Sequence, residues 1–158
     1  MPADPGARLL VLWRRCARLP GGRWLFGRLL RLQVPYSASI GARVEVLEPG
    51  YARLSLADRR AIRNHLRSVH AVALTNLGEL TSGLAMITAL PPGTRSIVTH
   101  IETEYSKKAR GTLVAECRAA VPEALGAATD LVVAADIRDA AGDVVARVQV
   151  RWRLAPPA

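Results

Sequence analysis

The sequence predicts an α+β domain in which one long buried helix lies against an antiparallel sheet. Three observations favour this class. Residues 70–87 carry apolar side chains at helical spacing on nearly every side. Two segments before them and four after them have apolar residues at every second position, which is typical of strands. Several connections are short, as between antiparallel neighbours, and 158 residues fit one domain.

The buried helix is expected within residues 64–87, with Ser68 as its N-cap. Its apolar stripe consists of Ala73, Leu77, Leu80, Leu84 and Ile87. Against this background Glu79 stands out, because a carboxylate without a nearby cation is costly to bury unless it is paired or used. Glu79 is therefore the first catalytic candidate. The alternative is a structural acid that pairs with an arginine from elsewhere in the chain.

The strands are expected on both sides of this helix. Residues 39–46 and 51–56 form a hairpin around the turn at 48–50. The later candidates are residues 95–105, 111–121, 128–138 and 143–153. Connections at 107–110 and 139–142 are short, so the strands that they join should be antiparallel neighbours.

Two amphipathic helices, residues 6–19 and 23–32, are expected before the sheet. Two interpretations stay open for them. They pack on the sheet and cover its open end or a ligand tunnel, which is favoured because surface helices of globular domains have the same pattern. Alternatively, residues 6–32 make a weak contact with a membrane surface. We expect residues 1–37 to be a helical extension and residues 38–154 to be the main domain.

The spacing of three polar residues resembles that of hotdog-fold acyl-CoA thioesterases, specifically the phenylacetate-pathway group and its relatives. Members carry an Asn six residues before a His, Gly-Gly after the His, and an acid nine residues beyond it. Asn64, His70 and Glu79 have these spacings, whereas Ala71-Val72 replaces Gly-Gly. Residues 104–113 resemble the family's aromatic, basic and Gly-Thr-Leu junction. The resemblance covers residues 38–154, and the whole chain is most similar to an uncharacterised branch with an N-terminal helical extension.

The resemblance implies a curved antiparallel sheet wrapped around a central helix and a thioester hydrolase. Glu79 would be its general base or nucleophile, and a backbone N–H of Ala71 or Val72 would polarise the thioester carbonyl at the helix start. Asn64 would hold the loop or bond the thioester, and His70 would lie at the same helix start. The structural alternatives are a turn residue for Asn64 and a capping residue for His70. Further substrate contacts are expected from Ser82 and, at the coenzyme A phosphates, from Lys107, Lys108 and Arg110.

Helix geometry requires a second chain for such a site. Nine residues turn a helix by about 900° and advance it by about 13 Å, so His70 and Glu79 point in nearly opposite directions. A site that uses both needs a homodimer or homotetramer, and the resemblance also implies active sites at a subunit interface. Because Ala71-Val72 crowds the helix start, the alternative function is a non-catalytic hotdog protein that binds acyl-CoA or fatty acyl groups.

The composition limits the classes of ligand and cofactor that we expect the protein to bind. Residues 1–35 hold seven arginines and one aspartate, or +6 of the net +9, so the rest of the chain carries only +3. This mild basicity fits coenzyme A or simple solubility, and no nucleic-acid reading motif is present. Neither the two cysteines nor the three histidines have metal-ligand spacing, and no redox cofactor is implied. We expect a cytoplasmic protein without a metal, whose only cofactor-like group is the coenzyme A of its substrate.

Overall fold

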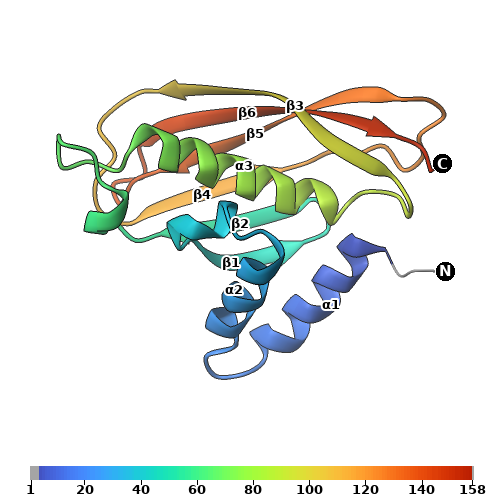
Figure 1. The fold of residues 1–158 in the computed structure, drawn as a ribbon, viewed down its shortest axis with the longest axis horizontal. Helices are drawn as coiled ribbons and strands as arrows, with labels where there is room; N and C mark the ends of the chain where they lie inside the picture. The colour runs from blue at the N-terminus through green and yellow to red at the C-terminus, as the bar shows by residue number, and fades with distance from the viewer. Residues whose placement is uncertain (1–3, 158) are drawn as a thin grey trace.

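A computed structural model describes residues 4–157, in which three α-helices accompany one six-stranded antiparallel sheet. The predicted α+β hotdog layout is confirmed, because the curved sheet wraps around one long helix (Figure 1). The elements are α1 (Pro5–Ala17), α2 (Gly22–Gln33), β1 (Arg43–Glu48), β2 (Tyr51–Leu56), α3 (Ala71–Ile87), β3 (Arg95–Tyr105), β4 (Leu113–Arg118), β5 (Thr129–Arg138) and β6 (Val144–Ala155), with short 3-10 helices at Ser37–Ile40 and Arg60–Ile62.

Helix α3 fills the concave side of the sheet. Its apolar residues, such as Leu77 and Met86, are almost fully buried together with inward-facing residues of every strand except β3. Gly78 permits the closest approach, since a Cβ at this position would lie 2.3 Å from Val148. The core therefore depends on a missing side chain as well as on large ones.

The start of α3 differs from the prediction. Ser68 is not the N-cap; His70 is, and its Nδ1 accepts a hydrogen bond of 3.1 Å from the Val72 N–H. Residues 64–68 form a turn instead, in which Asn64 Oδ1 accepts from the N–H groups of Leu66 and Ser68. Because Asn64 bonds these N–H groups locally and Arg63 bridges to Val69, the chain enters the helix two residues later.

The order of the strands is β1-β2-β4-β5-β6-β3, with every pair antiparallel. The expectation that the connection at 107–110 joins neighbouring strands was wrong, because it crosses from edge strand β3 to β4 in the middle of the sheet. The connection at 139–142 does join neighbours, β5 and β6. The first strand also begins later than expected, at Arg43, because residues 37–40 form a 3-10 turn that ends at Gly41 with φ 74°.

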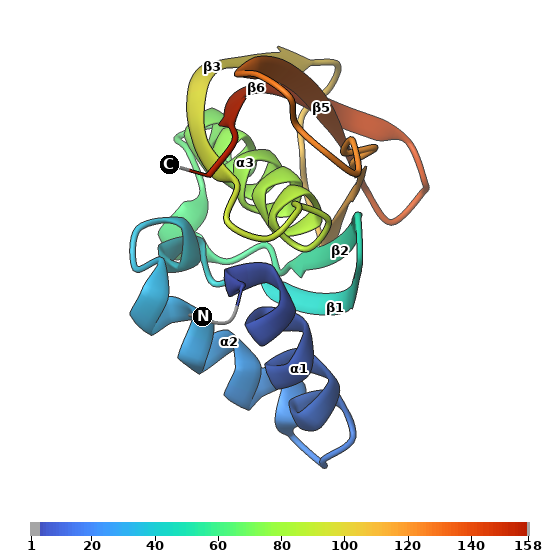
Figure 2. The ribbon, with the colours of Figure 1, turned by 90° about the vertical axis from the view of Figure 1, so that its right-hand side faces the viewer.

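The two N-terminal helices form an antiparallel hairpin that packs against β1 and the 3-10 turn, as the favoured interpretation predicted (Figure 2). Trp13 and Phe26 meet edge to face, with ring centroids 5.1 Å apart, and both are buried. Arg23 of α2 donates to Glu45 of β1 over 2.7 Å. In residues 4–157, no helix is long and apolar enough to cross a bilayer.

Candidate functional site

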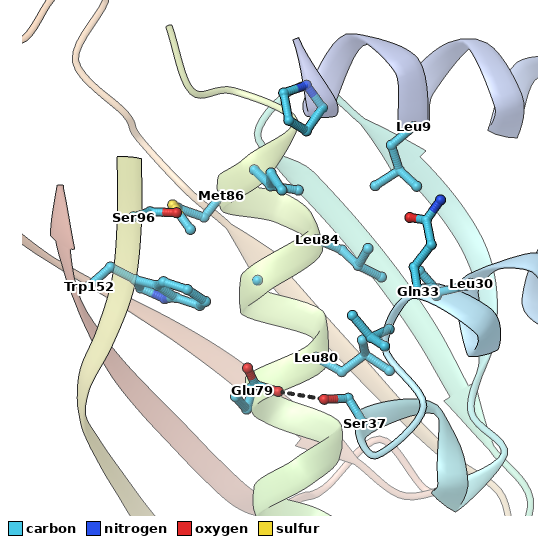
Figure 3. Close-up of a pocket in the computed structure, with 14 residues that line it drawn as sticks. Leu9, Leu30, Gln33, Ser37, Glu79, Leu80, Leu84, Met86, Ser96 and Trp152 are labelled. Carbon is cyan, nitrogen blue, oxygen red and sulfur yellow. Dashed lines mark hydrogen bonds between the residues drawn. The ribbon is translucent and has the colours of Figure 1, made fainter. Parts of the chain in front are cut away.

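Glu79 lies on the wall of an apolar cavity of about 210 Å³ between α3 and the N-terminal hairpin (Figure 3). The apolar wall comes from three places in the chain: α3, the hairpin, and strand β6 through Trp152. The lining residues are Pro5, Leu9, Leu30, Gln33, Val34, Ser37, Glu79, Leu80, Gly83, Leu84, Met86, Ile87, Ser96 and Trp152. The hairpin thus closes one side of the space that contains the carboxylate.

The Glu79 carboxylate has a single hydrogen-bond partner in the part of the chain that the structure describes. Ser37 Oγ donates to Glu79 Oε2 over 3.3 Å, and no cation of residues 4–157 forms a salt bridge with it. Burial raises the pKa of Glu79 above its ordinary value, and the Ser37 hydrogen bond partly opposes this rise. The predicted alternative, a structural acid paired with an arginine, has no counterpart among these residues. A partly buried, unpaired carboxylate of raised pKa is suited to accepting a proton.

Trp152 of β6 lines the cavity on the side of the sheet and faces α3 (Figure 3). Its ring edge lies against Gly83, where a Cβ would be 3.5 Å from the ring, and its Nε1 is buried without a hydrogen-bond partner in residues 4–157. Gly83 is one turn beyond Glu79 on α3, so a side chain at this position would enter the cavity. The small residue keeps space open directly beside the carboxylate.

The predicted helix-start residues lie together, about two and a half turns from Glu79. His70 and Val72 are exposed and line a shallow hollow with Ala73 and Asn76. The Val72 N–H already donates to His70 Nδ1, while the Ala71 N–H has no partner within residues 4–157. The Ala71 carbonyl accepts from the Tyr105 hydroxyl over 3.1 Å. One unbonded N–H of the helix start is therefore available for a ligand.

The other predicted residues are dispersed. Asn64 holds its own turn through three contacts to its Oδ1, and Ser82 is fully buried with its hydroxyl on the Glu79 carbonyl. Lys107 pairs with two aspartates, Asp139 at 2.6 Å and Asp143 at 2.7 Å. Lys108 is exposed, and Arg110 donates to the Leu66 carbonyl over 3.4 Å. Within one chain, none of these residues lines the cavity of Glu79.

Sequence reasoning missed Ser37 and Trp152, which contact or face Glu79 from distant parts of the chain. Neither belongs to a motif, and Ser37 lies 42 residues before the acid. Only the observation that the N-terminal helices were suited to covering a ligand tunnel pointed toward this region. Within the described residues, no group of three or more His, Cys, Asp or Glu side chains is placed to hold a metal ion.

Comparison with solved structures identifies the same fold in thioesterase-family proteins. A Pseudomonas aeruginosa protein of unknown function, described as a probable thioesterase, is 26% identical, with a TM-score of 0.73 over 87% of this chain and 96% of that chain. A structural-genomics target is also 26% identical, with a TM-score of 0.80 over 95% and 97%. A thioesterase family protein from Silicibacter pomeroyi is 17% identical, with a TM-score of 0.68 over 82% and 96%.

These likenesses confirm the hotdog thioesterase superfamily that the residue spacing predicted. A comparison with curated protein sequences finds no significant match. The family model described as a domain of unknown function, DUF4442, matches residues 22–154, which include α2, the sheet without the last residue of β6, and the Glu79 cavity except for its lining by Pro5 and Leu9 of α1. The chain belongs to this DUF4442 family.

Proposed function

We propose that the protein is a thioester hydrolase that cleaves acyl-CoA, with Glu79 as its general base or nucleophile. The observation that carries the proposal is a partly buried carboxylate without a cation partner in residues 4–157, at the wall of an apolar cavity. The apolar walls suit an acyl chain, and the carboxylate lies where the thioester at the end of that chain would react.

As a general base, Glu79 takes a proton from water while the water oxygen attacks the thioester carbonyl. The carbonyl oxygen becomes an oxyanion, which then collapses and expels the coenzyme A thiolate, and the thiolate takes up a proton. As a nucleophile, Glu79 instead attacks the carbonyl itself and expels the coenzyme A thiolate, which leaves an acyl anhydride on Glu79. Water then hydrolyses the anhydride and releases the carboxylic acid and the free Glu79 carboxylate. Both routes need a hydrogen-bond donor at the oxyanion, and the Ala71 N–H at a helix start supplies one together with the partial positive charge of the helix.

The donor and the base come together only if two chains combine, because they lie about 12 Å apart along one helix. Strand β3 offers the surface for such a dimer. It is the last strand of the sheet, eleven residues long, and nearly all of its side chains are exposed, including Ile97 at 65% and Ile101 at 39%. A long exposed edge of this kind pairs readily with another strand.

Antiparallel pairing of two β3 strands has a specific consequence for the site. The beginning of β3 lies beside the acid, since Ser96 lines the Glu79 cavity. The end of β3 lies beside the helix start, since the Tyr105 hydroxyl bonds the Ala71 carbonyl. A twofold axis near the middle of the strand therefore sets the acid of one protomer next to the helix start of its partner. The dimer so formed would contain two equivalent composite sites.

The cavity also limits the acyl group. A cavity of roughly 150 Å³ accommodates benzene, so a space of about 210 Å³ has room for an acyl chain of about eight carbons. For the coenzyme A phosphates, Lys108 and Arg110 remain the proposed contacts, because neither forms a salt bridge in residues 4–157. Lys107 is a weaker candidate, since two aspartates already neutralise its charge.

One observation favours the second candidate, a binding protein without turnover. His70 already occupies the Val72 N–H, and the Val72 side chain projects at the helix start with 56% of it exposed. The first feature removes a hydrogen-bond donor, and the second reduces the room for an oxyanion compared with the Gly-Gly of the resembling enzymes. In that case acyl-CoA would bind in the cavity and leave unchanged.

The deciding experiment is thiol release from acyl-CoAs of increasing chain length by the wild-type protein and the Glu79→Gln variant. We expect hydrolysis that is greatest for medium-length chains and falls at least about a hundredfold in the variant. Glu123→Gln is the matched control, because Glu123 is exposed in the loop between β4 and β5. Equal activity in the Glu79→Gln variant would refute the role of Glu79, and acyl-CoA binding without thiol release would establish the binding protein.

A further inference from the structure

The N-terminal hairpin is far more basic than its structural role requires. Residues 5–44 contain eight arginines and no aspartate or glutamate. Of the arginines in α1 and α2, only Arg23 forms a salt bridge within residues 4–157, with Glu45 of β1. Packing of the helices uses the opposite faces, since Leu9, Trp13, Phe26 and similar apolar residues are buried. The outward faces therefore carry uncompensated positive charge.

The same outward surface also carries large apolar side chains. On α2, Leu25 and Leu32 are 41% and 80% exposed, and they flank the partly buried Leu29 at helical spacing. These three leucines form a leucine ridge. Trp24 lies beside it on α2, 61% exposed, with the Arg28 guanidinium 5.2 Å from its ring centre. Leu19, in the turn between the helices, is 58% exposed. Exposed leucines and a tryptophan next to arginines need a partner that is both apolar and negatively charged.

The position of the hairpin makes this surface accessible. The turn between α1 and α2 lies farthest from the sheet in both views, and the helices project beyond the body of the domain (Figures 1 and 2). The edge strand β3 lies at the far end of the strand order from β1, and its first residues come near the hairpin only at the cavity that Ser96 lines. Pairing through β3 would therefore leave the end of the hairpin around the α1–α2 turn uncovered (Figures 1 and 2).

We propose that the α1–α2 hairpin docks on an anionic membrane surface, with Leu19, Trp24, Leu25 and Leu32 entering the interface and the arginines contacting lipid phosphates. Tryptophan and leucine on one side of a basic helix are the composition that such interfacial helices use. Each arginine near an anionic surface strengthens binding about fivefold, and the contributions of several arginines multiply in the binding constant. The phosphates of a nucleic acid would also bind the arginines, but they offer no apolar surface for the exposed leucine ridge.

Tryptophan fluorescence and vesicle sedimentation of the full chain test the proposal. Trp13 and Trp152 are buried, so Trp24 is the tryptophan that reports on the hairpin surface. With vesicles of phosphatidylcholine and phosphatidylglycerol, we expect the protein to sediment and its emission to shift to shorter wavelength. Vesicles of phosphatidylcholine alone should bind weakly. The Trp24→Phe variant should still sediment but lose the spectral shift.

Matched variants separate the apolar from the basic contribution. The double change Leu25→Ser and Leu32→Ser should weaken sedimentation at least about tenfold, whereas Val132→Ser, at a 50% exposed position on β5, should not. Arg15→Gln with Arg18→Gln should weaken it more than tenfold, whereas Arg95→Gln with Arg151→Gln should not. The proposal is overturned if the wild type stays in solution with anionic vesicles at low salt, or if the leucine double variant binds as tightly as wild type. It is also overturned if light scattering shows that this variant loses a self-association present in wild type.

Discussion

The Ser37 hydroxyl donates a hydrogen bond of 3.3 Å to Glu79 Oε2 and thereby connects the end of the N-terminal hairpin to the central helix. It is the one hydrogen bond of the carboxylate among residues 4–157, and it opposes the rise that burial causes in the pKa of Glu79. Ser37 therefore stabilises the charged form of the acid, which a base or nucleophile requires.

Replacing this hydroxyl should change the pH dependence of hydrolysis. In Ser37→Ala the ionised carboxylate loses its donor, so the pKa of Glu79 rises further and the acidic limb of the pH–rate profile moves to higher pH. At neutral pH we expect activity a few-fold lower, in line with the net value of about 1 kcal/mol for a hydrogen bond. Kinetics across the acid range measure this. Ser39→Ala, at an exposed position of the same turn, is the control, and an unshifted limb in Ser37→Ala would contradict the role of the bond.

The raised pKa of Glu79 also predicts how stability depends on pH. A raised pKa in the folded state means that this state binds the proton more tightly than the unfolded chain, so the contribution to stability is full below the ordinary pKa of 4.5 and is lost as pH rises through the folded value. Glu79→Gln removes this loss. We expect the variant to be more stable than wild type at neutral pH and to lose that advantage below pH 4.5.

Denaturant midpoints of both proteins at the two pH values measure the effect. The exposed Glu123→Gln change should alter stability little at either pH. A variant that is destabilised at neutral pH would show instead that the Glu79 carboxylate holds the fold together.

The sequence predicted the elements with local signals and missed those that depend on how segments meet. Helical spacing identified the buried segment around Leu77 and Leu80, and strict alternation identified strands such as Val144–Ala155. The edge position of β3 could not be predicted, because a short connection is compatible with a crossing as well as with a hairpin. The start of α3 was misplaced because Ser68 and His70 are both acceptable caps, and the choice is made by the turn that Asn64 stabilises.

The candidate site was likewise predicted only in part. Glu79 was predicted, since an acid on an otherwise apolar helix is visible in the sequence alone. Its cavity was not, because the wall combines Leu9, Leu30 and Trp152, which come together only through tertiary packing. Gly78 and Gly83 look alike in the sequence, yet a Cβ would lie 2.3 Å from Val148 at the first and 3.5 Å from Trp152 at the second. Such a difference depends on distances that no residue pattern contains.

Gly83 therefore offers a test of the cavity as the acyl site. Gly83→Ala should stabilise the protein by about 0.4–1 kcal/mol, because the unfolded chain loses freedom and the methyl group fits in ordinary contact with Trp152. The same methyl group occupies space beside Glu79, so the preferred acyl chain should become shorter. Thiol release across a chain-length series and thermal unfolding measure the two effects.

Gly27→Ala is the matched control for this change. Gly27 is also a helical glycine, but a Cβ there meets nothing within 4 Å, on the outward side of the hairpin. It should stabilise the protein similarly and leave chain-length preference unchanged. If both variants keep the wild-type preference, the acyl chain does not occupy the cavity beside Gly83.

Ala71→Pro tests the donor at the helix start without disturbing the fold. Proline is well accepted as the first residue of a helix, and His70 already has the extended conformation (φ −64°, ψ 140°) that precedes a proline. The change removes only the Ala71 N–H, which has no partner within residues 4–157. If this group stabilises the oxyanion, kcat should fall by about a hundredfold to a thousandfold while thermal stability is kept.

Mixed dimers then decide whether the site is shared between chains. In a heterodimer of Ala71→Pro and Glu79→Gln protomers, a composite site leaves one site with both groups intact and one with neither. Such a preparation should regain about half of wild-type activity per heterodimer, although each parent variant keeps only about a hundredth of it or less. Sites contained within single chains would leave the heterodimer as inactive as its parents, because every chain would lack one group. Co-expression with two affinity tags provides the heterodimer, and each parent purified through the same steps provides the baseline.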